Sequence, residues 1–306
     1  FLQLVELGNV HIVVAVLQAE ADPQQRSVLG QIVHTAAHRA HVYRRLSGAA
    51  LKLAEEKLAP FGERAILVQA SYTTLTEQLR RLGWSAVDGI VLDLGMSSMQ
   101  LDTPERGFSF LTDAPLDMRF DPSNPRTAAQ LVNELPEREL AEVLYKYGEE
   151  HNGRQVARAI IRARPLTSTR QLAEVVTRVT RGGASGIHPA TRTFQALRIA
   201  VNQELEQVEA VLPIAVSALA RPTVDRPAGR LAVIAFHSLE DRLVKQYFRQ
   251  EGRDCLCPPR QPICTCGHKA ILRELTRQPM RPQEEEIRDN PRSRSARLRI
   301  VERLKS

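Results

Sequence analysis

Two segments of the sequence place polar side chains directly after an apolar, β-branched run. The run at 87–93 ends in Asp93, with Ser97 shortly after it. The run at 229–236 is followed by His237. Carboxyl ends of parallel strands meet at one edge of a sheet, where α/β proteins bind ligands. A carboxylate, a hydroxyl and an imidazole there could bind a polar ligand or transfer a proton. Alternatively, Asp93 only caps the next element and His237 is a structural histidine.

The loop between residues 105 and 121 combines arginine with phenylalanine. Guanidinium groups such as those of Arg106 and Arg119 bind phosphate, and a ring such as that of Phe108 can stack on a base. These residue types together favour contact with a nucleic acid. The alternative is a packed surface loop that binds nothing.

All four cysteines of the chain lie close together, as Cys255, Cys257, Cys264 and Cys266. Prolines between the two pairs bend the chain, which would bring the pairs together. Four thiolates at such spacing predict a structural zinc site, with His268 as a spare ligand. The alternative is a surface loop with free thiols.

The chain of 306 residues has a net charge of +7, and seven basic residues with two acidic ones lie between 288 and 306. This positive end, which includes Arg292 and Arg294, favours a polyanionic partner. The alternative is a codon bias toward arginine in a GC-rich genome. The longest apolar stretch near the N-terminus has six residues, far below the roughly 20 that span a bilayer, and no signal peptide is recognisable. We therefore expect a cytoplasmic protein without a membrane partner.

The elements that position these side chains show two kinds of hydrophobic pattern along the chain. Helices and strands alternate before residue 126 and after 220, which predicts a parallel α/β sheet built from 49–125 and 221–306. Only helical patterns occur within 126–220, which predicts an inserted all-helical domain. The expected helices and strands of the first segment and the strand after the insertion are residues 49–58, 65–68, 72–82, 87–93 and 229–236.

Several helix ends carry recognisable signals. Gly148 is expected just beyond the end of an amphipathic helix. Ser168 with Gln171 predicts a capping box. Ser238 with Asp241 predicts the cap of the helix that follows the last apolar run.

Five stretches between about residue 49 and residue 304 resemble the RsmH (MraW) family. They read LDLGMSSMQLDTPERGFSF, PLDMRFDPSNPRTAAQLVNELPERELAEVLYKYGEE, GIHPATRTFQALRIAVNQELEQVE, GRLAVIAFHSLEDRLVK and EEIRDNPRSRSARLRIVERL. The resemblance implies a class I methyltransferase, with a Rossmann-like α/β sheet and an inserted all-helical substrate domain. It also implies methyl transfer from S-adenosylmethionine to the N4 amine of a cytidine in the decoding region of 16S ribosomal RNA, within the small ribosomal subunit.

The resemblance also assigns donor-binding residues. Asp93 and Gln100 match positions that bind the methyl donor in the family. Tyr72 stands where the family usually has phenylalanine, against the adenine of the donor. Tyrosine retains the flat ring face that this contact uses.

Methylation of a cytosine amine sets further requirements. The N4 lone pair is delocalised into the ring, so the reaction needs alignment within about 3–3.5 Å and a group that accepts a proton. The candidates for that group are Ser97, Asp117 and His237. The target base must also be unpaired or extruded. We expect contacts with the RNA at Arg106, Phe108, Arg119, Arg292 and Arg294.

Residues 1–48 depart from the family. The resemblance implies a first strand with a Gly-rich turn and a second strand ending in an acid that binds ribose, and neither is recognisable here. Where the ribose-binding acid is expected, residues 42–48 read VYRRLSG, without a carboxylate. We interpret 1–48 as an atypical segment that replaces the first donor-binding strands, through a changed reading frame or through real divergence. We therefore expect impaired donor binding. The alternative functions are a catalytically dead RNA-binding protein and a zinc-dependent interaction module on a dead enzyme scaffold.

Overall fold

The computed structural model describes residues 14–18, 39–44, 59–96, 103–180 and 188–305. They divide into two compact units. The sheet unit lies within residues 1–95 and 205–306, and the helical unit within residues 96–204. The domain boundaries at 126 and 220 that were expected from sequence texture remain a prediction.

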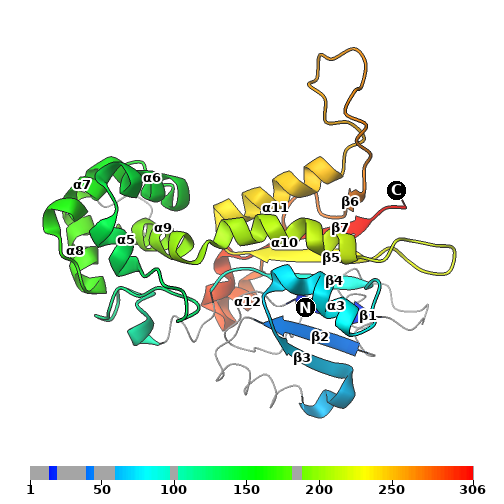
Figure 1. The fold of residues 1–306 in the computed structure, drawn as a ribbon, viewed down its shortest axis with the longest axis horizontal. Helices are drawn as coiled ribbons and strands as arrows, with labels where there is room; N and C mark the ends of the chain where they lie inside the picture. Colours follow the sequence, from blue (N-terminus) through cyan, green and yellow to red (C-terminus); the bar gives the residue numbers. More distant parts are fainter. Residues whose placement is uncertain (1–13, 19–38, 45–58, 97–102, 181–187, 306) are drawn as a thin grey trace. The chain divides into compact units, whose positions relative to one another are not determined.

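The sheet unit contains a seven-stranded sheet in the order β3-β2-β1-β4-β5-β7-β6 (Figure 1). The order 3-2-1-4-5 is that of a Rossmann sheet, so the expected α/β fold class is confirmed. The expectation of a parallel sheet is corrected to a mixed one, because β1 and β7 are each antiparallel to both of their neighbours. The strands are β1 (Val14–Gln18), β2 (Arg39–Arg44), β3 (Ala65–Gln69), β4 (Gly89–Asp93), β5 (Arg230–Ala235), β6 (Leu272–Glu274) and β7 (Arg297–Arg303).

Strand β1 runs against both of its neighbours. It pairs antiparallel with β2 and with β4, whereas β2 with β3 and β4 with β5 are parallel pairs. Strands β2 to β5 therefore end at the same edge, which we call the carboxyl edge. Val14, the first residue of β1, pairs with Tyr43 and Leu92. Strand β1 thus begins at the carboxyl edge and ends at the opposite one.

Both faces of the central strands are buried, as their continuous apolar runs require. Ile90 and Leu92 pack with apolar side chains of three helices on one face, and Val91 packs with Ala232 and Ile300 on the other. Those three helices are α3 (Leu75–Arg81), α10 (Glu204–Ala218) and α11 (Ser238–Glu251). A short helix, α12 (Glu284–Asp289), precedes β7.

The helical unit consists of amphipathic helices that bury their apolar faces in one shared core. Leu144, Ile160, Val176 and Leu197 come from four different helices and are all fully buried in it. The helices are α5 (Ala128–Glu134), α6 (Glu137–Gly148), α7 (Gly153–Ala163), α8 (Thr169–Val179) and α9 (Thr191–Asn202).

The helix-end signals have mixed outcomes. The capping box of Ser168 and Gln171 is confirmed at the start of α8. The placement of Gly148 beyond α6 is wrong, because Gly148 is the last helical residue and Glu149 adopts the left-handed conformation, with φ 49°. A Cβ on Gly148 would lie 2.6 Å from the carbonyl oxygen of Arg192 in α9. Glycine is needed there for close helix packing.

The strands expected at 65–68, 87–93 and 229–236 correspond to β3, β4 and β5. The helix expected at 72–82 begins as a 3-10 turn, Tyr72–Thr74, and continues as α3. The helix expected at 49–58 lies outside the described residues. None of the helices in the described part of the chain is long and apolar enough to cross a membrane.

Candidate functional site

The ends of β4 and β5 lie side by side at the carboxyl edge. Asp93 is in register with Ile234, and the N–H of Leu94 donates to the carbonyl of Ile234 over 2.9 Å. Gly95, with φ 101°, follows immediately, and a Cβ there would lie 3.3 Å from the ring of Phe236. The structure therefore confirms that the two polar strand ends meet at one edge.

Asp93 has an unusual environment for a carboxyl group. Its Oδ1 atom is buried and has no hydrogen-bond partner among the described residues. Burial, followed by the nearby negative charge of Glu240, raises the pKa of Asp93 to about 7. A carboxyl group with an open acceptor and a neighbouring carboxylate favours a ligand that brings hydrogen-bond donors or positive charge.

His237 caps the helix that starts at the end of β5. Its Nδ1 accepts the N–H of Glu240 at 3.4 Å, and the Glu240 carboxylate accepts the N–H groups of Phe236 and His237 at 3.0 and 3.3 Å. The predicted cap of Ser238 with Asp241 is therefore wrong by one residue. Because Nδ1 accepts, the neutral ring carries its proton on Nε2. The catalytic role of His237 stays a prediction.

Tyr72 follows β3 at the same carboxyl edge. It is buried, and its hydroxyl donates to Gln207 Oε1 in α10 over 2.9 Å. Ser71 accepts the N–H of Thr73 with its side chain and so caps the turn that holds Tyr72. These contacts hold the Tyr72 ring in place without a ligand. The contact of Tyr72 with adenine stays a prediction.

The arginine and phenylalanine loop lies in the helical unit. Arg119 forms a two-pronged ion pair with Asp117, with Nε to Oδ1 at 2.9 Å and Nη2 to Oδ2 at 2.8 Å. Burial alone would raise the pKa of Asp117, but hydrogen bonds and charge from Arg119 outweigh it and hold the pKa below its usual range. Arg106 donates to two backbone carbonyls of the loop, at 2.5 and 3.1 Å. Phe108 is buried against Phe120, with ring centroids 5.5 Å apart.

These contacts give each of the four predicted residues a role within the protein. The Asp117 carboxylate is ionised and engaged, which makes it a weak proton acceptor. Phe108 is 7% exposed, and its ring lies between neighbours that include Phe120 and the Arg106 guanidinium. Their predicted roles in catalysis and RNA binding stay predictions.

Comparisons with known proteins identify the family. Residues 35–304 match the sequence model of the MraW methylase family. The chain belongs to the MraW methylase family. It is 50% identical over 259 residues to a protein of Carboxydothermus hydrogenoformans named ribosomal RNA small subunit methyltransferase H, covering 83% of this chain and 81% of that protein. Proteins with the same name match at 54% identity over 244 residues in Thermomicrobium roseum and at 45% over 285 residues in Heliobacterium modesticaldum. They cover 79% and 88% of this chain, and 73% and 89% of their own lengths.

The MraW match starts upstream of the boundary inferred from the sequence. The resemblance was placed from about residue 49, whereas the family match begins at residue 35 and so includes β2. The start of the resemblance is therefore corrected from about residue 49 to residue 35. Strand β1 and the residues before it remain outside the match.

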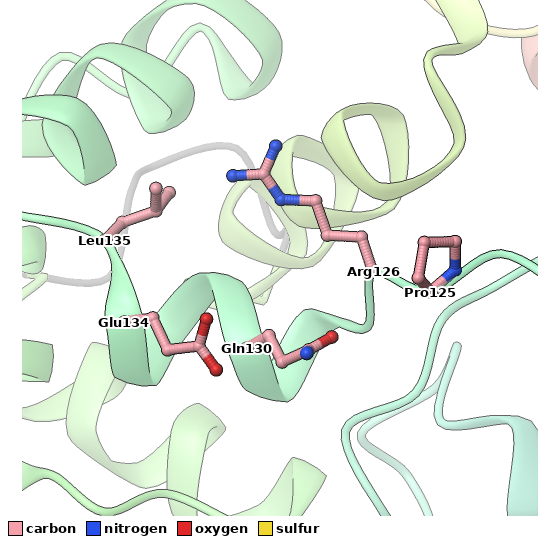
Figure 2. A pocket seen from close by; sticks show the side chains of 5 residues that line it. All are labelled: Pro125, Arg126, Gln130, Glu134 and Leu135. Atoms are coloured by element: carbon pink, nitrogen blue, oxygen red, sulfur yellow. The ribbon is translucent and has the colours of Figure 1, made fainter.

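Other predicted residues of the MraW site have separate locations. Ser97 and Gln100 lie outside the described residues. Arg292 and Arg294 are exposed in a 3-10 helix, Pro291–Ser295, just before β7. The helical unit also has a small open hollow beside α5 that is lined by residues such as Arg126 and Glu134 (Figure 2). None of the predicted site residues lines that hollow.

Sequence reasoning missed the importance of Glu240. This fully buried carboxylate joins the cap of α11 to the environment of Asp93. Glutamate three residues after a cap residue is a recognised signal. It was overlooked because histidine is not among the preferred cap residues, so the pattern was assigned to Ser238 instead.

Proposed function

We propose that this chain is an S-adenosylmethionine-dependent methyltransferase scaffold for the N4 amine of a cytidine in the decoding region of 16S ribosomal RNA. Small-subunit ribosomal RNA would be its partner and the cytoplasm its location. The names of its relatives support the class of substrate. The single observation that supports a ligand site most directly is the buried Oδ1 of Asp93 at the carboxyl edge, which has no hydrogen-bond partner in the described part of the chain.

Asp93 fits one part of this donor. S-adenosylmethionine carries positive charge on its ammonium and sulfonium groups and hydrogen-bond donors on its ribose and adenine. When bound, it supplies a methyl group on a positively charged sulfur. Asp93 would bind a donor group with its open oxygen, and Tyr72 would present a ring held by Gln207. Glu240 would hold the end of β5 through two backbone N–H groups and favour a cation beside Asp93.

The first strand does not fit the donor. Dinucleotide and donor sites of this fold lie at the carboxyl ends of strands 1 and 4, where the strand order reverses. Here β1 is antiparallel to β4, so the chain leaves β1 from the opposite edge to Asp93. A turn directly after β1 would start away from Asp93. Strand β2 also ends in Arg44, without the expected acid.

The proposal therefore includes weak donor binding by this chain. Losing a charge-assisted hydrogen bond costs about 1.5–3 kcal/mol, and the missing turn removes further backbone donors. Together these losses correspond to at least roughly two to three orders of magnitude in affinity. A catalytically dead RNA-binding protein on the same scaffold is the second candidate, and the direction of β1 is the observation that favours it.

The test combines methyl transfer with donor binding. Small subunits that lack the modification are incubated with the purified chain and labelled donor at millimolar concentration, and the product nucleosides are identified by mass spectrometry. N4-methylcytidine, lost in Asp93→Asn, supports the enzyme. Label in another nucleoside contradicts the proposed target. The RNA-binding alternative is supported if the chain binds the RNA but calorimetry shows no heat of S-adenosylmethionine binding and no methylated product forms.

A further inference from the structure

The loop between α11 and β6 carries a cluster that the methyltransferase function does not use. It spans residues 252–271 and extends from the sheet unit in Figure 1. The apolar side chains at its tip contribute little to any core, since Leu256 and Ile263 are 39% and 76% exposed. Hydrophobic burial therefore cannot hold its tip, yet all four cysteines meet there.

The four sulfur atoms have the spacing of a tetrahedral metal site. The Sγ–Sγ distances are 3.4 Å for Cys255–Cys264, 3.6 Å for Cys264–Cys266, 3.8 Å for Cys255–Cys266 and 4.0 Å for Cys257–Cys264. Four sulfurs around zinc, each about 2.3 Å from it, define tetrahedron edges of about 3.8 Å. Covalently bonded sulfurs would be about 2.05 Å apart, and all four thiols are free.

Backbone N–H groups point at the same sulfur atoms. Those of Leu256, Cys257 and Thr265 donate to the Sγ atoms of Cys266, Cys255 and Cys257, at 3.3, 3.4 and 3.5 Å. Donors aimed at sulfur stabilise thiolates, which are the form of cysteine that binds a metal. This second observation is independent of the sulfur spacing.

Hydrogen bonds hold the base of the loop together, and the cysteines take no part in them. His268 Nδ1 is hydrogen-bonded with the carbonyl of Arg253 at 2.8 Å, and its Nε2 lies 3.6 Å from Glu251. The N–H of Ala270 donates to Asp254 Oδ1 over 3.2 Å. His268, expected as a spare ligand, therefore holds the base of the loop, and the ligand set contains the cysteines alone.

We propose that Cys255, Cys257, Cys264 and Cys266 bind one Zn²⁺ ion that folds the tip of this loop. Thiolate ligands and tetrahedral spacing select zinc among the common divalent ions. Four protein ligands fill the coordination shell, so the ion is structural and leaves no position for substrate. Metal binding supplies the folding energy that a loop without a core lacks.

Metal analysis of the full-length chain gives the first test. The protein is purified under reducing conditions, with any affinity tag removed, and its metals are measured by mass spectrometry. We expect about one zinc per chain, released when the thiols are titrated with a mercurial reagent. Iron in place of zinc, or less than about half an equivalent of zinc, would overturn the proposal. Cobalt substitution gives an independent readout, through the absorption bands of tetrahedral sulfur coordination.

Variants separate ligands from neighbours. Cys264→Ser should lose zinc, whereas the matched control His268→Asn should retain it, because His268 acts only at the base. Trypsin cleavage after Arg260 and Lys269 reports on the loop without relying on activity. We expect protection in the zinc form and rapid cleavage after chelation. Equal cleavage in both forms, or loss of zinc from His268→Asn with retention by Cys264→Ser, would contradict the proposal.

Discussion

The raised pKa of Asp93 makes the stability of the fold depend on pH. Its pKa of about 7 lies above the value of about 3.8 that it has when unfolded. Between these two values the folded chain holds a proton that the unfolded chain has lost, so stability falls as pH rises through this range. Above pH 7 both states are ionised and the loss is complete.

Asp93→Asn should remove this pH dependence. Relative to the unsubstituted chain, the variant should gain up to about 4 kcal/mol in free energy of unfolding between pH 4 and pH 8, because the amide never ionises. Urea unfolding at several pH values measures this. Asp117→Asn is the control of opposite sign, since the pKa of Asp117 is lowered and its stabilisation is lost only at acid pH. An Asp93→Asn effect that is constant with pH would show that Asp93 is ionised throughout.

At the scale of elements, Asp241 of α11 pairs with two arginines of β7. Arg299 is 4% exposed and donates to both carboxylate oxygens of Asp241, at 2.6 and 3.1 Å. The more exposed Arg297 donates to Oδ2 at 3.2 Å. Asp241→Ala leaves that guanidinium buried without its partner, which should cost about 3–5 kcal/mol of stability. The double variant with Arg299→Met should recover most of the loss. Denaturant unfolding of Asp241→Ala, Arg299→Met and the double variant gives the coupling free energy between the two side chains. A loss of stability below about 1 kcal/mol in Asp241→Ala would contradict this role of the ion pair.

The contact between α6 and α9 depends on glycine at position 148, which has no side chain. Gly148→Ala should destabilise the helical unit by about 1–3 kcal/mol, because its Cβ would push against the Arg192 carbonyl at 2.6 Å. Gly153→Ala is the milder control, with its nearest neighbour at 3.2 Å. Helical circular dichroism during urea unfolding compares the two. An equal or larger loss for Gly153→Ala would count against a packing role for Gly148.

Local signals predicted some elements and could not predict others. The apolar runs of β4 and β5 identify buried strands because they are short and rich in β-branched residues as well as continuously apolar. Gly148 follows an amphipathic helix, as a C′ glycine does, and only the approach of α9 reveals its packing role. The cap at His237 was missed because an uncommon cap residue stands next to a common one, Ser238. The orphaned oxygen of Asp93 depends on tertiary burial, which no spacing in the sequence encodes.

At the scale of the whole molecule, strand order and strand direction disagree. The sheet has the Rossmann order, and β2 to β5 are mutually parallel in direction, as that fold requires. Only the segment upstream of the MraW match supplies a central strand that runs the other way. An apolar segment can fill a buried strand position in either direction, because burial is not directional. Strand β1 therefore fills its position in the sheet while running opposite to β2 and β4.

Exchanging residues 1–48 should restore the donor site. A chimera that carries the matching N-terminal segment of the Carboxydothermus hydrogenoformans relative in place of residues 1–48 regains a sequence from a methyltransferase of the same family. Calorimetry should show S-adenosylmethionine binding roughly 100- to 1000-fold tighter than in the original chain, as expected for about 3–4 kcal/mol of recovered contacts. Methyl transfer to unmodified small subunits should rise with it. The chimera with Asp93→Asn is the control and should lose both gains. Equally tight donor binding by the chimera and the original chain would show that residues 1–48 already form a working donor site, and equally weak binding would contradict the role given to this segment.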